Sequence, residues 1–362
     1  MKRRFVWIVR TLMQVSEVYG RHLRKKRARL FLIGLLVLFA SLVSLAIGAY
    51  SMTAPEAFMT LVGFSETPQQ SVVLFNLRLP RVTAALIAGA GLSASGCVMQ
   101  TGLRNPLASP STLGVSAAAI FGANVSIILL LGESSGYGGA FYAPYLTTAT
   151  AFFFAMVSTL LILSLSRLRG FSPQALILAG VALNTLFNAM TVIIQYFADE
   201  TELSRAVFWT FGDLSRAGWN EIWILGVVVL ISLIHFYRRR LDYNTLSNGD
   251  DTARSLGVDA KRVRFTSLFI AAAVTAVSVS FLGLISFIGL LGPHIMRRIV
   301  GNDHRFLLVG SILLGSLILL LADILSRSVM APIVLPVGAV TSLLGAPLFL
   351  TILLKGGMRH AR

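Results

Sequence analysis

Long apolar runs separated by short polar segments make up the chain from Leu30 onward. Each run holds few charges and approaches the roughly 20 residues that a helix needs to cross a bilayer core about 30 Å thick. The pattern therefore predicts an all-α, polytopic membrane protein with ten transmembrane helices. The predicted spans are residues 30–52, 82–103, 112–131, 145–165, 173–197, 219–237, 263–283, 284–299, 306–326 and 334–354.

The stretch from Phe265 to Met296 is apolar without a polar break, and it is predicted to form two helices rather than one. A single helix of this length would measure about 48 Å, which is too long for a bilayer unless the helix tilts steeply. Arg264 and Arg297 flank the two ends, and basic residues at both ends favour the same side of the membrane. Because Gly283 supplies a place for the chain to turn, we expect two spans, the second of them short.

Basic residues are distributed unevenly along the chain. Of the 31 Lys and Arg residues, 26 lie in the segments 1–29, 104–111, 166–172, 238–264, 297–305 and 355–362, which the ten spans would place on one side of the membrane. An excess of basic residues marks the cytoplasmic side, so both termini are predicted to be cytoplasmic. The membrane thus accounts for the net charge of +16, and we expect no nucleic-acid partner.

The first 29 residues are basic and lack the apolar region and cleavage site of a secretory signal. We expect residues 1–29 to form a cytoplasmic extension that contacts anionic lipid headgroups, where each basic residue contributes about 1 kcal/mol. The only cysteine, Cys97, lies in an apolar run and is expected to be a small buried residue.

The sequence lacks the motifs of several other function classes. There is no phosphate-binding GxxxxGK[ST] loop and no His/Cys cluster with metal-ligand spacing. No nucleophile–base pair favours an intramembrane enzyme or receptor. We therefore expect no enzymatic activity and no metal or cofactor bound by this chain.

The energy source is also expected to lie outside the chain. An ion-coupled secondary carrier needs ionisable groups inside the membrane, but Asp323 is the only acid well inside a predicted span. Arg327, one helical turn later, is expected to pair with it. Uphill transport by this protein would then draw its energy from another chain.

Two arginines flank the start of the second span in the sequence Arg78-Leu79-Pro80-Arg81. Pro80 suits the first turn of a helix, where its missing N–H group would have no partner in any case. Residues three apart point to similar sides, so Arg78 and Arg81 are expected to be exposed together on the outer face. They could bind carboxylates, or they could extend toward lipid headgroups.

Several ordered sequence blocks resemble the permeases of iron-siderophore, haem and cobalamin ABC importers, the FecCD-type family. The blocks are Ala88–Gly96, Gln100–Pro110 (QTGLRNPLASP), Leu113–Val115, Leu178–Asn184, Ala253–Val258, Phe287–Arg298, Asp303–Arg305, Leu321–Asp323, Leu335–Gly338 and Gly345–Phe349. The resemblance extends from about residue 30 to residue 356. It implies a ten-helix permease domain over residues 30–356, with both ends cytoplasmic.

The resemblance also implies an assembly in the cytoplasmic membrane of a bacterium or archaeon. Two permease subunits, identical or paralogous, would form the translocation path between them. Two ATPase subunits, which bind ATP and Mg²⁺, would dock beneath, and a substrate-binding protein would deliver the cargo from outside. An iron-siderophore is the expected cargo; haem, cobalamin and oxyanions such as molybdate remain alternatives.

Particular residues acquire roles from the same resemblance. Arg78, Arg81 and Arg327 match arginines that dock the binding protein. The segment 247–264 matches the cytoplasmic coupling segment, in which Asp250, Ala253, Arg254 and Gly257 are the expected ATPase contacts. Gly257 is expected to end one short helix and to let the next begin at an angle.

The cytoplasmic gate is expected at Asn105 and Leu107 and, from a weaker match, at Ser172. Pro173 and Gln174 depart from the small hydroxyl residues that the family pattern favours after Ser172. Asn184 and Asn188 lie one turn apart on the fifth span. They are expected to line a hydrated path or to form hydrogen bonds between helices.

Overall fold

The computed structural model describes residues 2–48, 50–65, 67–131, 139–168 and 173–357, and every regular element in these ranges is a helix. The longer helices are α1 (Lys2–Ala46), α4 (Leu79–Gly102), α5 (Val115–Asn124), α6 (Gly139–Leu168), α7 (Pro173–Tyr196), α8 (Glu200–Thr210), α9 (Trp219–Arg238), α12 (Ala260–Leu282), α13 (Ile288–Val300), α14 (His304–Ser328) and α15 (Val337–Gly357). The short elements are α2 (Ala54–Leu61), α3 (Pro68–Val72), η1 (Val73–Arg78), η2 (Pro110–Leu113), η3 (Val125–Leu130), η4 (Leu214–Arg216), α10 (Arg240–Leu246) and α11 (Asp250–Ser255).

Each of the ten predicted spans coincides with a helical segment, if α5 and η3 are counted as one. Within the described ranges, seven helices are long and apolar enough to cross a membrane. The segments Val115–Leu130 and Val337–Thr351 are shorter apolar helices, and α13 has 13 residues. The all-helical membrane architecture is thus confirmed, whereas ten crossings stay a prediction.

The predicted break in the long apolar stretch is present. Helix α12 ends at Leu282, and Gly283 follows with φ +74°. Glycine adopts this backbone conformation at little steric cost because it has no Cβ. Helix α13 then begins at Ile288. The turn therefore divides what hydropathy alone would read as a single helix.

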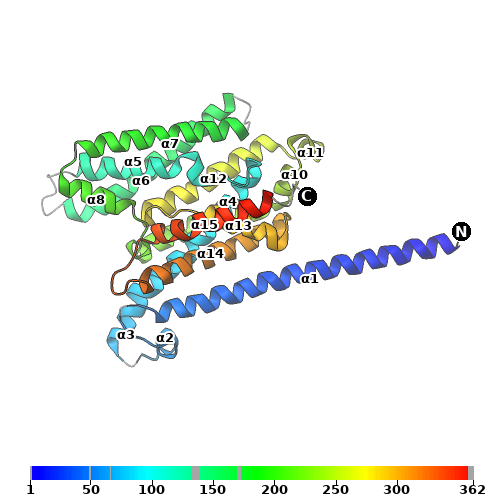
Figure 1. Ribbon diagram of the computed structural model, residues 1–362, viewed down its shortest axis with the longest axis horizontal. Coiled ribbons are helices and arrows are strands. Elements are labelled where there is room, and N and C mark those ends of the chain that lie inside the picture. Colours follow the sequence, from blue (N-terminus) through cyan, green and yellow to red (C-terminus); the bar gives the residue numbers. More distant parts are fainter. Residues whose placement is uncertain (1, 49, 66, 132–138, 169–172, 358–362) are drawn as a thin grey trace.

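The two ends of the bundle differ in the elements that they carry. Figure 1 shows α10, α11, the N-terminus of α1 and the end of α15 at one end, with α2, α3 and α8 at the opposite end. The first group belongs to the segments that the charge distribution assigns to the cytoplasm. The second group belongs to segments assigned to the outer side. The two groups thus lie at opposite ends of the bundle, and the assignment of those ends to the cytoplasm and the outside stays a prediction.

Helix α1 is a single helix of 45 residues. At about 1.5 Å per residue it is roughly 68 Å long, and Figure 1 shows its N-terminal part projecting beyond the other helices. The basic segment 1–29 is therefore continuous with the first span. The helix ends at Ala46, six residues before the predicted end of that span.

Helix α4 lies at the centre of the bundle, in contact with α9, α12, α13 and α14. Its run of small residues, Ala88–Gly96, lets the neighbouring backbones approach closely. A Cβ atom built on Gly96 would lie 1.7 Å from the Gly289 carbonyl oxygen of α13. One built on Gly89 would lie 2.5 Å from the Gly315 carbonyl oxygen of α14. The crossings of α4 with α14 and with α13 thus depend on the absence of a side chain at Gly89 and at Gly96, respectively.

Candidate functional site

Arg78 is buried near the end of the bundle that carries α2 and α3, and its guanidinium group caps the end of α1. Nη1 donates hydrogen bonds to the carbonyl oxygens of Leu45 at 2.7 Å and Ala46 at 2.8 Å, and Nη2 donates to the carbonyl of Tyr50. The last carbonyl groups of a helix have no partner within the helix. Arg78 supplies such partners from a different segment, η1.

Arg81 and Arg327 share one buried carboxylate. Asp323 has no exposed surface (0%). Its Oδ1 lies 2.6 Å from Arg81 Nε, and its Oδ2 lies 2.8 Å from Arg327 Nη2. Arg327 also donates to Ser44 Oγ at 2.6 Å. The cluster joins α1, α4 and α14, and it confirms the predicted pair between Asp323 and Arg327.

The expectation that Arg78 and Arg81 are exposed on the outer face is wrong. Both are buried, because the chain itself provides carbonyl and carboxylate acceptors for their guanidinium groups. Burying an arginine is costly unless it is paired and hydrogen-bonded. Acceptors distant in the sequence therefore hold these side chains inside. Docking of a binding protein at Arg78, Arg81 and Arg327 stays a prediction.

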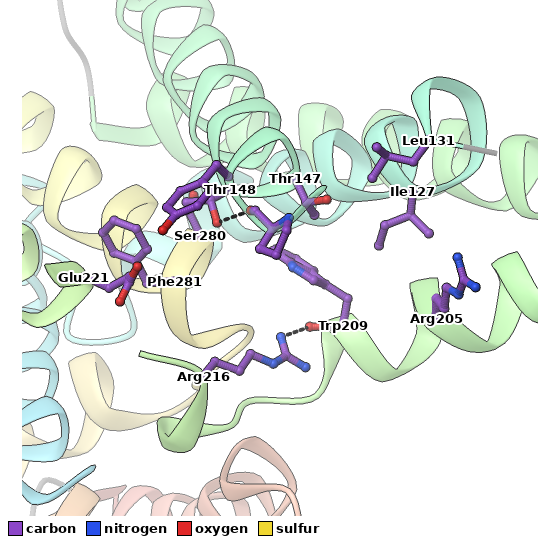
Figure 2. Close-up of a pocket in the computed structure, with 12 residues that line it drawn as sticks. Ile127, Leu131, Thr147, Thr148, Arg205, Trp209, Arg216, Glu221, Ser280 and Phe281 are labelled. Carbon is purple, nitrogen blue, oxygen red and sulfur yellow. Dashed lines mark hydrogen bonds between the residues drawn. The ribbon is translucent and has the colours of Figure 1, made fainter. Parts of the chain in front are cut away.

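A cavity of about 720 Å³ opens at the same end of the bundle, between η3, α6, α8, α9 and α12. Figure 2 shows Arg216 on one side of it, with a hydrogen bond from Nη1 to the Trp209 carbonyl oxygen at 2.7 Å. Nη2 of Arg216 donates to the Phe208 carbonyl oxygen at 2.6 Å, so this side chain caps α8. The cavity wall combines apolar side chains with Arg205 and Glu221.

At the opposite end, the coupling segment has the bent shape that the sequence predicts. Helix α11 ends at Ser255, and Gly257 follows with φ +78°. Asp259 then begins α12, because its Oδ1 accepts hydrogen bonds from the backbone N–H groups of Lys261 and Arg262. The positive φ of Gly257 and the cap at Asp259 together set the angle between the two helices.

The four predicted ATPase contacts occupy different environments. Ala253 is completely buried, which is a correction, since a buried methyl group cannot contact a partner. Asp250 is partly buried and paired with Arg264 at 2.9 Å. Arg254 and Gly257 are exposed. Leu256, which the sequence did not single out, is 64% exposed directly before Gly257.

The predicted gate residues follow the end of α4. Asn105 Oδ1 accepts a hydrogen bond from the Leu107 backbone N–H at 2.9 Å, which closes a tight turn. Leu107 is 43% exposed. Ser172 lies outside the described residues.

The side-chain amides of Asn184 and Asn188 on α7 form no hydrogen bond with the residues that the structure describes. Asn188 is exposed, and Asn184 is half-buried. The alternative of hydrogen bonds to other helices of the same chain is therefore not observed for either amide. Instead, Gln195 of α7 donates to Asn124 Oδ1 of α5 at 2.9 Å.

A polar network centred on His304 of α14 joins α10 to the end of α4. His304 is buried; its Nε2 lies 2.8 Å from Thr101 Oγ1, and its Nδ1 lies 2.9 Å from Asn244 Oδ1. Arg297 donates to Gln100 Oε1 at 3.4 Å. No group of three or more His, Cys, Asp or Glu residues that could hold a metal ion occurs in the described part of the chain.

A model of the FecCD transport family matches residues 35–355, which is most of the chain. The chain belongs to the FecCD transport family. The FecCD resemblance predicted from the motif blocks is thereby confirmed. Members of this family are permease subunits of ABC importers.

Relatives of this FecCD protein are similar over almost their whole length. A protein assigned as an ABC transporter permease of Methanocaldococcus jannaschii is 45% identical over 95% of this chain and 99% of its own. The iron(3+)-hydroxamate import permease FhuG of Bacillus subtilis is 34% identical over 89% of this chain and 95% of its own. The hemin transport permease HmuU of Yersinia pestis is 35% identical over 90% of this chain and 96% of its own.

A solved structure has the same fold. A transporter assigned to the metal-chelate type of ABC transporters, in an inward-facing conformation, superposes with a TM-score of 0.80. Its sequence is 32% identical, and the match covers 91% of this chain and 99% of the other. The FecCD protein is thus a multi-pass permease subunit of an ABC importer, with a role in transport.

Proposed function

We propose that this chain carries an iron-siderophore inward across the cytoplasmic membrane of a bacterium or archaeon by alternating access. A separate ATPase subunit would drive the cycle. The observation that carries the proposal is the bent segment from α10 to the start of α12, with its tip exposed at Arg254, Leu256 and Gly257. It lies at the same end of the bundle as the N-terminus of α1. Family membership and the similarity to a metal-chelate type transporter support the class of cargo.

The proposed assembly contains two permease subunits, two ATPase subunits and one binding protein. Asn184 and Asn188 of α7 are unpaired within the described chain, as residues that line a hydrated path between two permeases would be. Asn105 and Leu107 would form the cytoplasmic gate at the end of α4. The second permease would be another copy of this chain or a paralogue.

Docking of the binding protein is proposed over Arg78, Arg81 and Arg327. The chain's own acceptors occupy these guanidinium groups, so an acidic side chain of the binding protein would compete with Asp323 for Arg81 or Arg327. Arginine can bind two carboxylate oxygens at once, whereas lysine acts as a point charge. Arg81→Lys is therefore expected to weaken capture of loaded binding protein while the net charge stays the same.

The proposed function is tested by purifying the permease with its ATPase and reconstituting the complex in liposomes. With binding protein outside, ATP inside should drive uptake of a ⁵⁵Fe-siderophore. An ATPase variant that cannot hydrolyse ATP should abolish uptake. Hemin, cobalamin and molybdate are compared in parallel, and preferential uptake of one of them would reassign the cargo. Uptake that survives without ATP but is lost with the proton gradient would instead identify an ion-coupled carrier.

Leu256 is proposed as the apolar contact between the coupling segment and the ATPase. Leu256→Asp places a charge on the exposed tip of the segment, where a partner would have to desolvate it. We expect the ATPase to co-purify at least about tenfold less well, since burying an unpaired charge commonly costs more than 1.4 kcal/mol. Leu256→Met keeps an apolar side chain of similar size and should bind normally. Equal co-purification of the Asp variant would exclude Leu256 from the interface.

A further inference from the structure

Asp250, the first residue of α11, is held by two arginines from other elements. Its Oδ1 accepts a hydrogen bond from Arg264 Nη2 at 2.9 Å, and its Oδ2 lies 3.4 Å from Arg264 Nη1. The guanidinium group of Arg104 also contacts Oδ1. The carboxylate therefore points toward the helices of the permease rather than away from them.

The two arginines connect Asp250 to the end of α4. Arg264 lies in the second turn of α12, is 1% exposed, and donates from Nε to the carbonyl oxygen of Gly102 at 2.7 Å. Gly102 is the last residue of α4. Arg104 follows two residues later with φ +45° and directly precedes Asn105. One carboxylate thus joins the first turn of α11 to the turn that holds the predicted gate.

The electrostatic environment keeps this carboxylate charged. Partial burial acts to raise the pKa of Asp250, but the hydrogen bond from Arg264 and the charges of Arg264 and Arg104 outweigh it and hold the pKa below its usual value. The pair with Arg264 is charge-assisted and has two points of contact. A buried arginine also depends on such a partner. The connection is therefore suited to transmit force without a change of protonation.

We propose that Asp250 is a positioning residue that transmits movement of α11 to the gate turn at residues 104–107. It is not, on this proposal, a contact for the ATPase. The inference rests on the proposed coupling function of this segment. The ATPase would engage the exposed tip at Leu256 and displace α11, and the Asp250 carboxylate would move Arg104 and the end of α4 with it.

The neighbouring helix α10 has separate anchors that do not involve the Asp250 carboxylate. Tyr243 Oη lies 2.9 Å from Ser267 Oγ in α12. Asn244 Oδ1 accepts a hydrogen bond from the backbone N–H of His304 in α14 at 2.9 Å. Loss of the Asp250 carboxylate would leave these contacts in place.

The test compares Asp250→Asn with Asp251→Asn in the full complex with ATPase and binding protein in liposomes. The measured quantity is cargo taken up per ATP hydrolysed. Asp250→Asn removes the charge from the connection, and we expect this ratio to fall about tenfold, within the range of typical coupling between sites. ATPase co-purification and hydrolysis should persist. Asp251 lies on the same helix with a fully exposed carboxylate, and Asp251→Asn should keep the wild-type ratio.

Arg104→Ala breaks the same connection at its gate end. Its side chain is partly exposed and lies outside the helices, so a loss of folding is not expected. We expect the same fall in the ratio, and the double variant Asp250→Asn/Arg104→Ala should be no worse than either single variant. An additive double variant, or an unchanged ratio in Asp250→Asn, would overturn the proposal.

Other results separate this inference from the proposed function. If Asp250→Asn loses the ATPase while Asp251→Asn retains it, Asp250 is a contact and the positioning role is wrong. If the wild-type chain itself binds no ATPase, the proposed function fails before the role of Asp250 arises. An unchanged ratio with normal wild-type transport overturns only the inference.

Discussion

Asp323→Ala is expected to lower the free energy of unfolding by about 3–5 kcal/mol, the usual cost of removing one partner from a buried ion pair. The substitution leaves Arg81 and Arg327 buried without their shared carboxylate. It also loosens the contact among α1, α4 and α14, because Nη2 of Arg327, which pairs with Asp323, also donates a hydrogen bond to Ser44 Oγ of α1. Thermal unfolding of the purified permease in detergent would measure the effect as a large fall in Tm.

Glu221→Ala is the matched control for this prediction. Glu221 is also acidic and lies in the first turn of α9, but it forms no ion pair among the described residues and is only half-buried. We expect its removal to change the free energy of unfolding by less than about 0.5 kcal/mol, as is common for surface positions. If Asp323→Ala and Glu221→Ala had the same Tm, Arg81 and Arg327 would have other acceptors available.

Gly96→Ala is expected to have the second large effect. The added methyl group would lie 1.7 Å from the carbonyl oxygen of Gly289, so the backbones of α4 and α13 would have to separate. Overpacking usually lowers the free energy of unfolding by about 1–3 kcal/mol. We expect a loss at or above the upper end of this range, because the contacting atom belongs to the backbone of Gly289. Size-exclusion chromatography and thermal unfolding would report this as aggregation or a lowered Tm.

The control for Gly96→Ala is Gly226→Ala on α9. There the nearest heavy atom, Ile87 Cδ1, would lie at 3.5 Å, an ordinary van der Waals contact. Because alanine favours a helix over glycine by roughly 0.5–1 kcal/mol, this variant should be as stable as the wild type or slightly more stable. Equal behaviour of the two variants would mean that the crossing of α4 and α13 adapts without cost.

The helical segments were the most predictable part of this protein. In lipid, the backbone must satisfy its own hydrogen bonds, so a long apolar run has few alternatives to a helix. Gly283 and Gly257 were predicted as turns for a local reason, and both have positive φ. The pair between Asp323 and Arg327 was also predictable, because residues four apart in a helix are neighbours.

The environments of the candidate site residues were much less predictable. Arg78 and Arg81 were expected at the surface, yet the end of α1 and Asp323 accept their hydrogen bonds. Asp250 was expected to face a partner, yet it pairs with Arg264 and Arg104. In each case the decisive acceptor or donor lies far away in the sequence, or in an element whose orientation no local pattern defines.

The sequence by itself determined that this is an all-helical membrane protein of the FecCD family, because hydropathy, charge distribution and ordered motifs are local properties of the chain. Only the tertiary structure decided which charged groups meet. Burial makes the pairing of a charge obligatory, but the partner is whichever group the packing of distant helices brings near. Arg78, Arg81 and Asp250 are accordingly the positions where the sequence-based expectation and the structure differ most.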